Sequence, residues 1–203
     1  MALPLLAADH PGPTLPIHLV TPATLAARLD ALGGPLAAFA RAARYEARAG
    51  ALLVVPDASG GLAGALFGLG GPTDAARTPF LPGKVASLLP PGDWRFDGEV
   101  GDETLAALGF ALEGWRFRRY KSAPEREVRL VVGASVDLAA VGRTAEAVFL
   151  ARDLVDTPAN DLGPAELASA VRTAFEAAGG AVTEIVGDDL IAANFPLVHA
   201  VGK

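Results

Sequence analysis

The segment RDLVDTPANDLGP, residues 152–164, lies between two amphipathic helical patterns and decides how the chain is organised. Before it, apolar residues recur every three or four positions over 135–155, as in one long helix, and Pro158 prevents that helix from continuing. After it, a pattern that starts with proline predicts a second helix over 164–178. We therefore expect a linker helix, a break, and the beginning of a second structural unit.

The residues before this linker alternate between strand and helix patterns. Strands are predicted over 16–20, 51–55, 62–69, 93–96, 115–120 and 127–132. Helices are predicted over 21–32, 35–49 and 104–112. The second and third strands flank a turn and form a hairpin in the simplest interpretation, and a last strand is predicted over 181–186. This intermixing indicates an α/β protein.

Composition narrows the class of function. The 203 residues are enough for one full domain and an appendage. A net charge of -6 disfavours nucleic-acid and membrane-surface partners, because both are anionic. The absence of cysteine excludes disulfides, thiolate zinc sites and cysteine nucleophiles, and fits a cytoplasmic protein. No stretch is long and apolar enough for a signal peptide or a membrane span.

The residues that could bind a metal are scattered. The three histidines are His10, His18 and His199, and none has a second histidine three to five residues away. His18 lies in an apolar strand pattern, which favours a hydrogen-bonded core or edge histidine over a ligand. Carboxylates are paired at Asp102 and Glu103 and at Asp188 and Asp189. Both pairs are typical of helix starts, where negative charge favours the helix dipole.

Two further patterns allow a functional and a structural interpretation. The glycines Gly60, Gly61, Gly64, Gly68, Gly70 and Gly71 could cradle a phosphate, but neither Lys-Ser nor Lys-Thr follows them and turns or bulges explain them better. Residues 115–121 interleave aromatic and cationic side chains, as in a platform for single-stranded nucleic acid. An amphipathic strand that buries Trp115 and Phe117 is the alternative, and the acidic composition favours it.

Three stretches together resemble leucyl aminopeptidases of the bacterial, di-metal type. Residues 152–164 resemble the linker signature Arg-Asp-Leu-Val-Asn-Thr-Pro-Ala-Asn, with Asp156 where the family more often has Asn. Residues 115–121 resemble the family's strand that ends in Arg-Tyr-Lys, and residues 194–203 resemble its segment Asn-Phe-Pro-Leu-Ile-His-Ala-Val-Gly. Residues 1–100 fit the family only in general pattern.

The resemblance implies that the chemistry lies outside this chain. In the family, a Lys, several Asp and a Glu of a C-terminal domain hold two divalent ions, zinc or manganese, which activate a water. The motifs that carry them, Val-Gly-Lys-Gly to Phe-Asp-Thr-Gly-Gly and Asn-Thr-Asp-Ala-Glu-Gly-Arg, are absent from the 203 residues. Lys203 belongs to an earlier segment and is not the catalytic lysine. We therefore expect no catalytic, cofactor-binding or metal-binding residue here.

The resemblance also implies a domain plan. Residues 1–134 form an N-terminal domain, a mixed sheet flanked by helices that resembles a macro domain. Residues 135–160 form the linker helix and signature, and residues 161–203 the truncated start of a second α/β domain, because the chain stops inside an apolar run. In a full-length hexamer this N-terminal domain would assist assembly or access of peptides to the catalytic domain.

Two rival hypotheses remain open. A stand-alone macro-like module would bind ADP-ribose or nucleic acid, on fold analogy alone. A naturally truncated paralogue would assemble with a full-length enzyme and modulate it.

Overall fold

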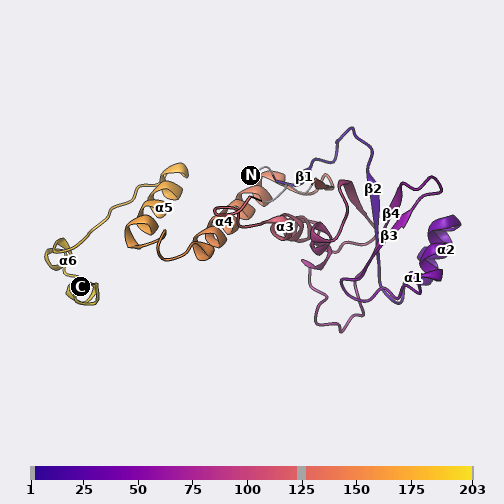
Figure 1. Ribbon diagram of the computed structural model, residues 1–203, viewed down its shortest axis with the longest axis horizontal. Coiled ribbons are helices and arrows are strands. Elements are labelled where there is room, and N and C mark those ends of the chain that lie inside the picture. Colours follow the sequence, from indigo (N-terminus) through magenta and orange to yellow (C-terminus); the bar gives the residue numbers. More distant parts are fainter. Residues whose placement is uncertain (1–2, 123–126, 203) are drawn as a thin grey trace. The chain divides into compact units, whose positions relative to one another are not determined.

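The chain consists of two units, residues 1–152 and 153–203. Figure 1 labels helices and strands of both. A computed structural model describes residues 3–122 and 127–202.

A six-stranded mixed sheet forms the first unit, with strand order β1-β6-β5-β2-β4-β3. The strands are β1 (Leu5–Leu6), β2 (Leu15–Val20), β3 (Leu52–Pro56), β4 (Leu62–Gly68), β5 (Gly92–Asp97) and β6 (Val128–Val131). All neighbours are parallel except β3 and β4, which form the predicted antiparallel hairpin. The α/β prediction of a mixed sheet flanked by helices is confirmed.

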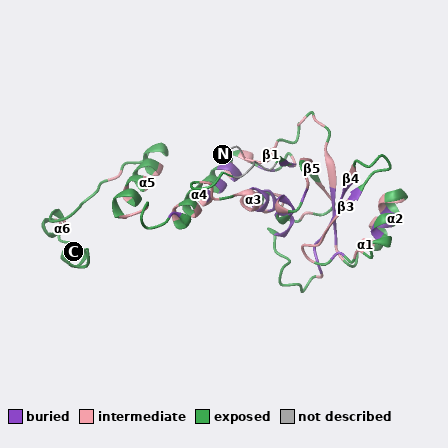
Figure 2. Ribbon diagram, in the orientation of Figure 1, coloured by how far each residue is buried: buried purple, intermediate pink, exposed green. Residues whose placement is uncertain are grey.

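Helices cover both faces of this sheet because β2 alternates its side chains between two cores. Ile17 and Leu19 pack in the larger core with residues of α3 (Glu103–Gly114) and of the 3-10 helix η1 (Leu81–Ser87). Val20 packs on the other face with α1 (Leu25–Leu32) and α2 (Gly34–Ala42). Figure 2 shows the buried residues gathered on the strands and on α3.

The helix predicted over 35–49 ends early, at Ala42. Arg44 and Ala47 take left-handed backbone conformations, with φ of 51° and 55°, which a continuing helix does not allow. The Tyr45 hydroxyl donates a hydrogen bond to the Ala51 carbonyl at 2.8 Å and holds the turn that leads into β3. Local helical spacing is overridden here by the need to return the chain to the sheet.

Two predicted strands are wrong. Residues 115–120 and residues 181–186 form no strand. The short strand β1, which the sequence pattern did not reveal, pairs with β6 instead. Alternating apolar and polar residues show that a segment can bury one side. They do not show that the segment hydrogen-bonds to a neighbouring strand, which a β-strand also requires.

The second unit begins near the end of the long predicted helix, α4 (Leu138–Asp156), and helices are the only regular secondary structure among its described residues. They are α5 (Pro164–Ala177), α6 (Asp189–Ala192) and α7 (Pro196–Val201). None of these three helices has a buried residue (Figure 2). In the described part of the chain, no helix is long and apolar enough to span a membrane.

Candidate functional site

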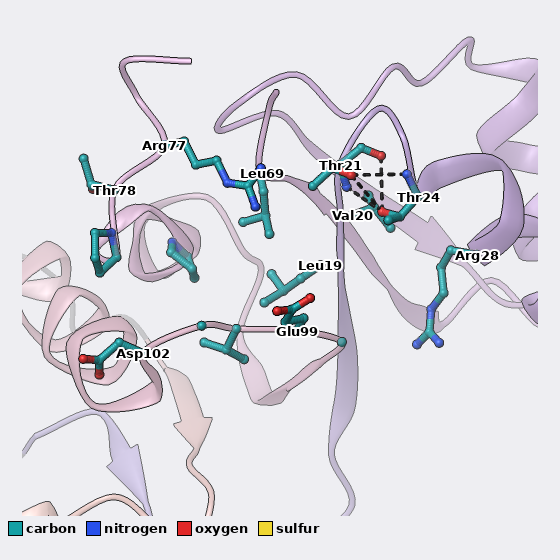
Figure 3. Close-up of a pocket in the computed structure, with 15 residues that line it drawn as sticks. Leu19, Val20, Thr21, Thr24, Arg28, Leu69, Arg77, Thr78, Glu99 and Asp102 are labelled. Carbon is teal, nitrogen blue, oxygen red and sulfur yellow. Dashed lines mark hydrogen bonds between the residues drawn. The ribbon is translucent and has the colours of Figure 1, made fainter. Parts of the chain in front are cut away.

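A cavity of about 450 Å³ lies at the carboxyl ends of the parallel strands β2, β4 and β5 (Figure 3). The chain leaves β2 toward α1 on one face of the sheet and leaves β5 toward α3 on the other face. Such a reversal opens a crevice between neighbouring strand ends, where open α/β sheets bind ligands. The volume is within the range of small-molecule sites.

The loop after β5 forms one wall of this cavity. Gly98 has φ of +119°, and a Cβ atom there would lie 3.0 Å from the Leu19 carbonyl oxygen, so that a larger residue would strain the loop. At its end, the Asp102 side chain accepts a hydrogen bond from the Leu105 amide at 2.9 Å and caps α3. The exposed Glu99 stands between these two fixed points and lines the cavity.

A cluster around the buried His18 joins β2, α1 and β5 beside the cavity. His18 is only 3% exposed, and its Nδ1 lies 2.9 Å from Asp97 Oδ2 and 3.0 Å from Arg28 Nη2. Arg28 also donates a hydrogen bond to Asp97. Burial lowers the pKa of His18, and Arg28 adds to this, while the Asp97 carboxylate acts in the opposite direction. The prediction of a hydrogen-bonded core histidine is confirmed.

The other two histidines have separate carboxylate partners. His10 Nε2 lies 3.0 Å from Asp93 Oδ2, which Arg129 also contacts, and His199 Nε2 lies 2.9 Å from Asp188 Oδ1. Within residues 3–122 and 127–202, no three His, Cys, Asp or Glu side chains come together as a metal site requires. The residues present here do not fit a two-metal centre, and the prediction that its ligands lie elsewhere stays a prediction.

Both carboxylate pairs mark helix starts, as predicted. Asp102 caps α3, and Glu103 accepts hydrogen bonds from the Gly133 amide at 2.7 Å and from the Ser135 hydroxyl at 2.9 Å. Asp188 precedes the first residue of α6, which is Asp189. Glu103 therefore has a structural role, tying the start of α3 to the end of β6.

The glycine cluster belongs to the β3–β4 hairpin and the segment after it, where no helix begins. Gly61 donates its amide hydrogen to Asp57 Oδ1 at 2.8 Å in the turn. Gly68 lies against the backbone, where a Cβ atom would be 2.1 Å from the Arg48 carbonyl oxygen. Turns, positive φ angles and close contacts thus account for these glycines except Gly71, at which a Cβ atom would meet nothing within 4 Å.

The aromatic and cationic segment 115–121 is not the amphipathic strand that we predict. Trp115 and Phe117 are half-buried, and Trp115 lies under the Arg152 guanidinium, whose carbon is 5.4 Å from the ring centroid. The same guanidinium donates a hydrogen bond to the Leu112 carbonyl at 2.7 Å, in the last turn of α3. The first residue of the linker segment therefore holds α4 to α3.

The rest of the linker segment stops α4 and starts α5. The buried Thr157 donates its hydroxyl hydrogen to the Asp153 carbonyl at 2.6 Å. The Gly163 amide donates to Glu166 at 3.0 Å at the start of α5. Lys203, which we do not expect to be the catalytic lysine, lies outside the described residues.

A family model for the N-terminal domain of M17 aminopeptidases matches residues 15–133, more than half of the 203 residues. The chain belongs to the M17 aminopeptidase family. The matched range begins with β2 and ends two residues after β6, and it includes the cavity and the His18 cluster. The resemblance inferred from the linker segment is thereby confirmed.

Relatives of this M17 chain are longer. Probable cytosol aminopeptidases of Methylorubrum populi and Nocardia farcinica are 34% and 38% identical to it over 149 and 115 residues. The alignments cover 63% and 50% of this chain but only 30% and 23% of those proteins.

Solved structures of longer proteins contain the same fold. The cytosol aminopeptidase of Coxiella burnetii superposes with a TM-score of 0.80 at 25% identity, over 92% of this M17 chain and 40% of that protein. The bottromycin maturation enzyme BotP in complex with Mn has a TM-score of 0.58 at 26% identity, over 83% and 37% of the two chains. Tomato leucine aminopeptidase, with a TM-score of 0.71 at 17% identity, shows the fold alone.

Proposed function

We propose that this chain is the N-terminal part of a cytoplasmic, metal-dependent aminopeptidase that releases N-terminal amino acids from peptides. The observation that carries the proposal is the M17 N-terminal domain over residues 15–133, a range that contains strands β2 to β6. The probable cytosol aminopeptidases that resemble it support the activity and the location.

This chain contributes no metal ligand to the proposed reaction. The described residues bring no three potential ligands together, whereas the longer relatives have most of their length outside the matched region. The manganese complex of BotP supports divalent ions in the complete enzyme. With its site outside these residues, the two-metal centre would supply the activated water and polarise the scissile carbonyl.

The role of the first unit is then architectural, assisting hexamer assembly or peptide access. We retain the division into a domain over 1–134, a linker over 135–160 and the start of a peptidase domain over 161–203. The stand-alone module for ADP-ribose or nucleic acid receives no support from the relatives and solved structures named above, which are aminopeptidases and BotP.

Hydrolysis of leucine p-nitroanilide with added manganese or zinc tests the proposal. The 203-residue chain is assayed beside the complete product of its gene, with a chelator-treated sample as control. We expect activity only in the longer protein and its loss on chelation. Activity of the 203-residue chain itself would contradict the non-catalytic role, and inactivity of both proteins with manganese and zinc would contradict the aminopeptidase proposal.

A further inference from the structure

Two side chains of opposite charge at the cavity have no hydrogen-bond or ion-pair partner among the described residues. They are Arg77, before η1, and Glu99, in the loop after β5. The other charged side chains of the lining have partners: Arg28 contacts Asp97 through Nη2, although its buried Nε has no hydrogen-bond partner, and Asp102 caps α3. Arg77 and Glu99 are therefore the cation and the anion of the lining whose side chains have no partner among the described residues.

The backbone holds these two charges on different segments. The Arg77 amide donates to the Asp74 carbonyl at 2.9 Å, and Asp74 Oδ1 accepts the Ala76 amide at 2.9 Å, which fixes the turn that carries Arg77. Glu99 follows Gly98, whose backbone lies against Leu19. In Figure 3 the Arg77 guanidinium points toward Leu69, and the Glu99 carboxylate lies beside Leu19. No ion pair forms between them.

The floor between the two charges is apolar. Leu19 is 7% exposed and Leu69 is 9% exposed, and both line the cavity together with Val100 and Pro82. The nearby hydroxyls of Thr21 and Thr24 lie 3.1 Å apart and hydrogen-bond to each other. A ligand that fits this lining carries a carboxylate, an ammonium group and a small apolar part.

We propose that the cavity binds a free α-amino acid with an aliphatic side chain. Arg77 receives the carboxylate in a charge-assisted hydrogen bond, Glu99 receives the ammonium group, and the aliphatic side chain lies on Leu19 and Leu69. The binding itself does not rest on the proposed peptidase function. In an aminopeptidase, however, such a site would respond to the class of molecule that the reaction releases.

A phosphate or nucleotide fits the cavity less well. Arg77 is the one free cation among the described lining residues, and Glu99 and Asp102 would face a polyanion with like charge. Phosphate groups in proteins are usually held by several cations or by backbone amides at a glycine-rich turn before a helix. The lining therefore favours a zwitterion.

Ligand-observed NMR titration of the 203-residue chain tests this assignment with L-leucine as the probe. We expect saturable binding, weakened about tenfold or more for leucinamide, which lacks the carboxylate, and for 4-methylpentanoate, which lacks the ammonium group. Inorganic phosphate and ADP serve as anionic competitors. If binding does not saturate by about 10 mM leucine, the dissociation constant is too high for the cavity to be a specific leucine site, and the proposal is overturned. Tighter binding of phosphate or ADP than of leucine would overturn it as well.

Variants separate this cavity from other binding surfaces. Arg77→Gln and Glu99→Gln remove one charge each from exposed positions, and we expect each to weaken leucine binding about tenfold or more. Arg143→Gln and Glu146→Gln remove the same charges from exposed positions of α4 outside the cavity and should leave the affinity unchanged. Equal affinity in all four variants, each folded by circular dichroism, would assign the binding elsewhere and overturn the proposal.

Discussion

At the scale of single residues, His18 makes the stability of the first unit depend on pH. Burial lowers its pKa below the ordinary value of 6.5, so the folded protein binds this proton less tightly than the unfolded chain does. The stabilisation is therefore complete above pH 6.5 and is lost as the pH falls through the folded pKa.

We expect the urea-derived free energy of unfolding to fall between about pH 7.5 and about pH 5, and to fall less in His18→Gln. His199→Gln is the matched control, because it removes a histidine and leaves His18 in place. Parallel pH profiles for wild type and His18→Gln would show that His18 does not cause the dependence.

Arg152, the first residue of the linker segment, makes two contacts that require an arginine. Its guanidinium contacts the Trp115 ring and the Leu112 carbonyl together, and a shorter amide reaches neither in the same geometry. Arg152→Gln should lower the free energy of unfolding by about 1–3 kcal/mol, from the charge-assisted hydrogen bond and the cation–π contact. Arg143→Gln, on the same helix but exposed, should have little effect in the same urea titration. If both variants lose the same free energy of unfolding, the effect comes from removing a positive charge from α4 and not from the contacts of Arg152.

At the scale of elements, η1 and α3 approach each other so closely that only glycine fits between them. A Cβ atom on Gly83 would lie 2.3 Å from the Gly109 carbonyl carbon and from the Phe110 nitrogen. Gly83→Ala should therefore destabilise the unit by about 1–3 kcal/mol or more, because backbone atoms of both helices must move apart. Gly71→Ala is the control, since its Cβ atom meets nothing within 4 Å. Thermal unfolding checks both, and a normal Gly83→Ala melting temperature would mean that the two helices separate at little cost.

The sequence predicts an element well where the apolar pattern of that element alone determines which of its residues enter the core. Strand β2 and the β3–β4 hairpin are examples, because their apolar runs face one or both cores. The segment 115–120 alternates in the same way, yet Trp115 contacts Arg152, which is distant in the sequence. Local periodicity contains no information on such a partner, and the early end of α2 at Ala42 has the same origin.

The sequence predicts the fold class but not the cavity. Arg77 and Glu99 stand in no motif, and they share a cavity because β2 lies between β4 and β5 in the sheet. Strand order of this kind is a property of tertiary structure. Gly98 and Gly101 lie on either side of Glu99 and indicate a tight loop in the sequence. They do not indicate which part of the protein the loop faces.

At the scale of the whole molecule, the two units differ in how much apolar surface they bury. The first unit contains three buried clusters, whereas α5, α6 and α7 contain no buried residue. In α7, Leu197 and Val201 are 81% and 87% exposed. Leu197 and Val201 lie four residues apart on α7, on one face of the helix, and an exposed apolar face of this kind favours association in water.

We therefore expect the 203-residue chain to self-associate in a concentration-dependent manner, as measured by light scattering after size-exclusion chromatography. The double variant Leu197→Ser and Val201→Ser removes much of the apolar area of α7 and should shift the equilibrium toward monomer. Ala177→Ser, also exposed but small, should not. A monomeric wild-type chain at all concentrations would contradict the expectation. Association that persists in the double variant would place the contact on another surface, with Phe175 of α5, which is 57% exposed, as the next position to change.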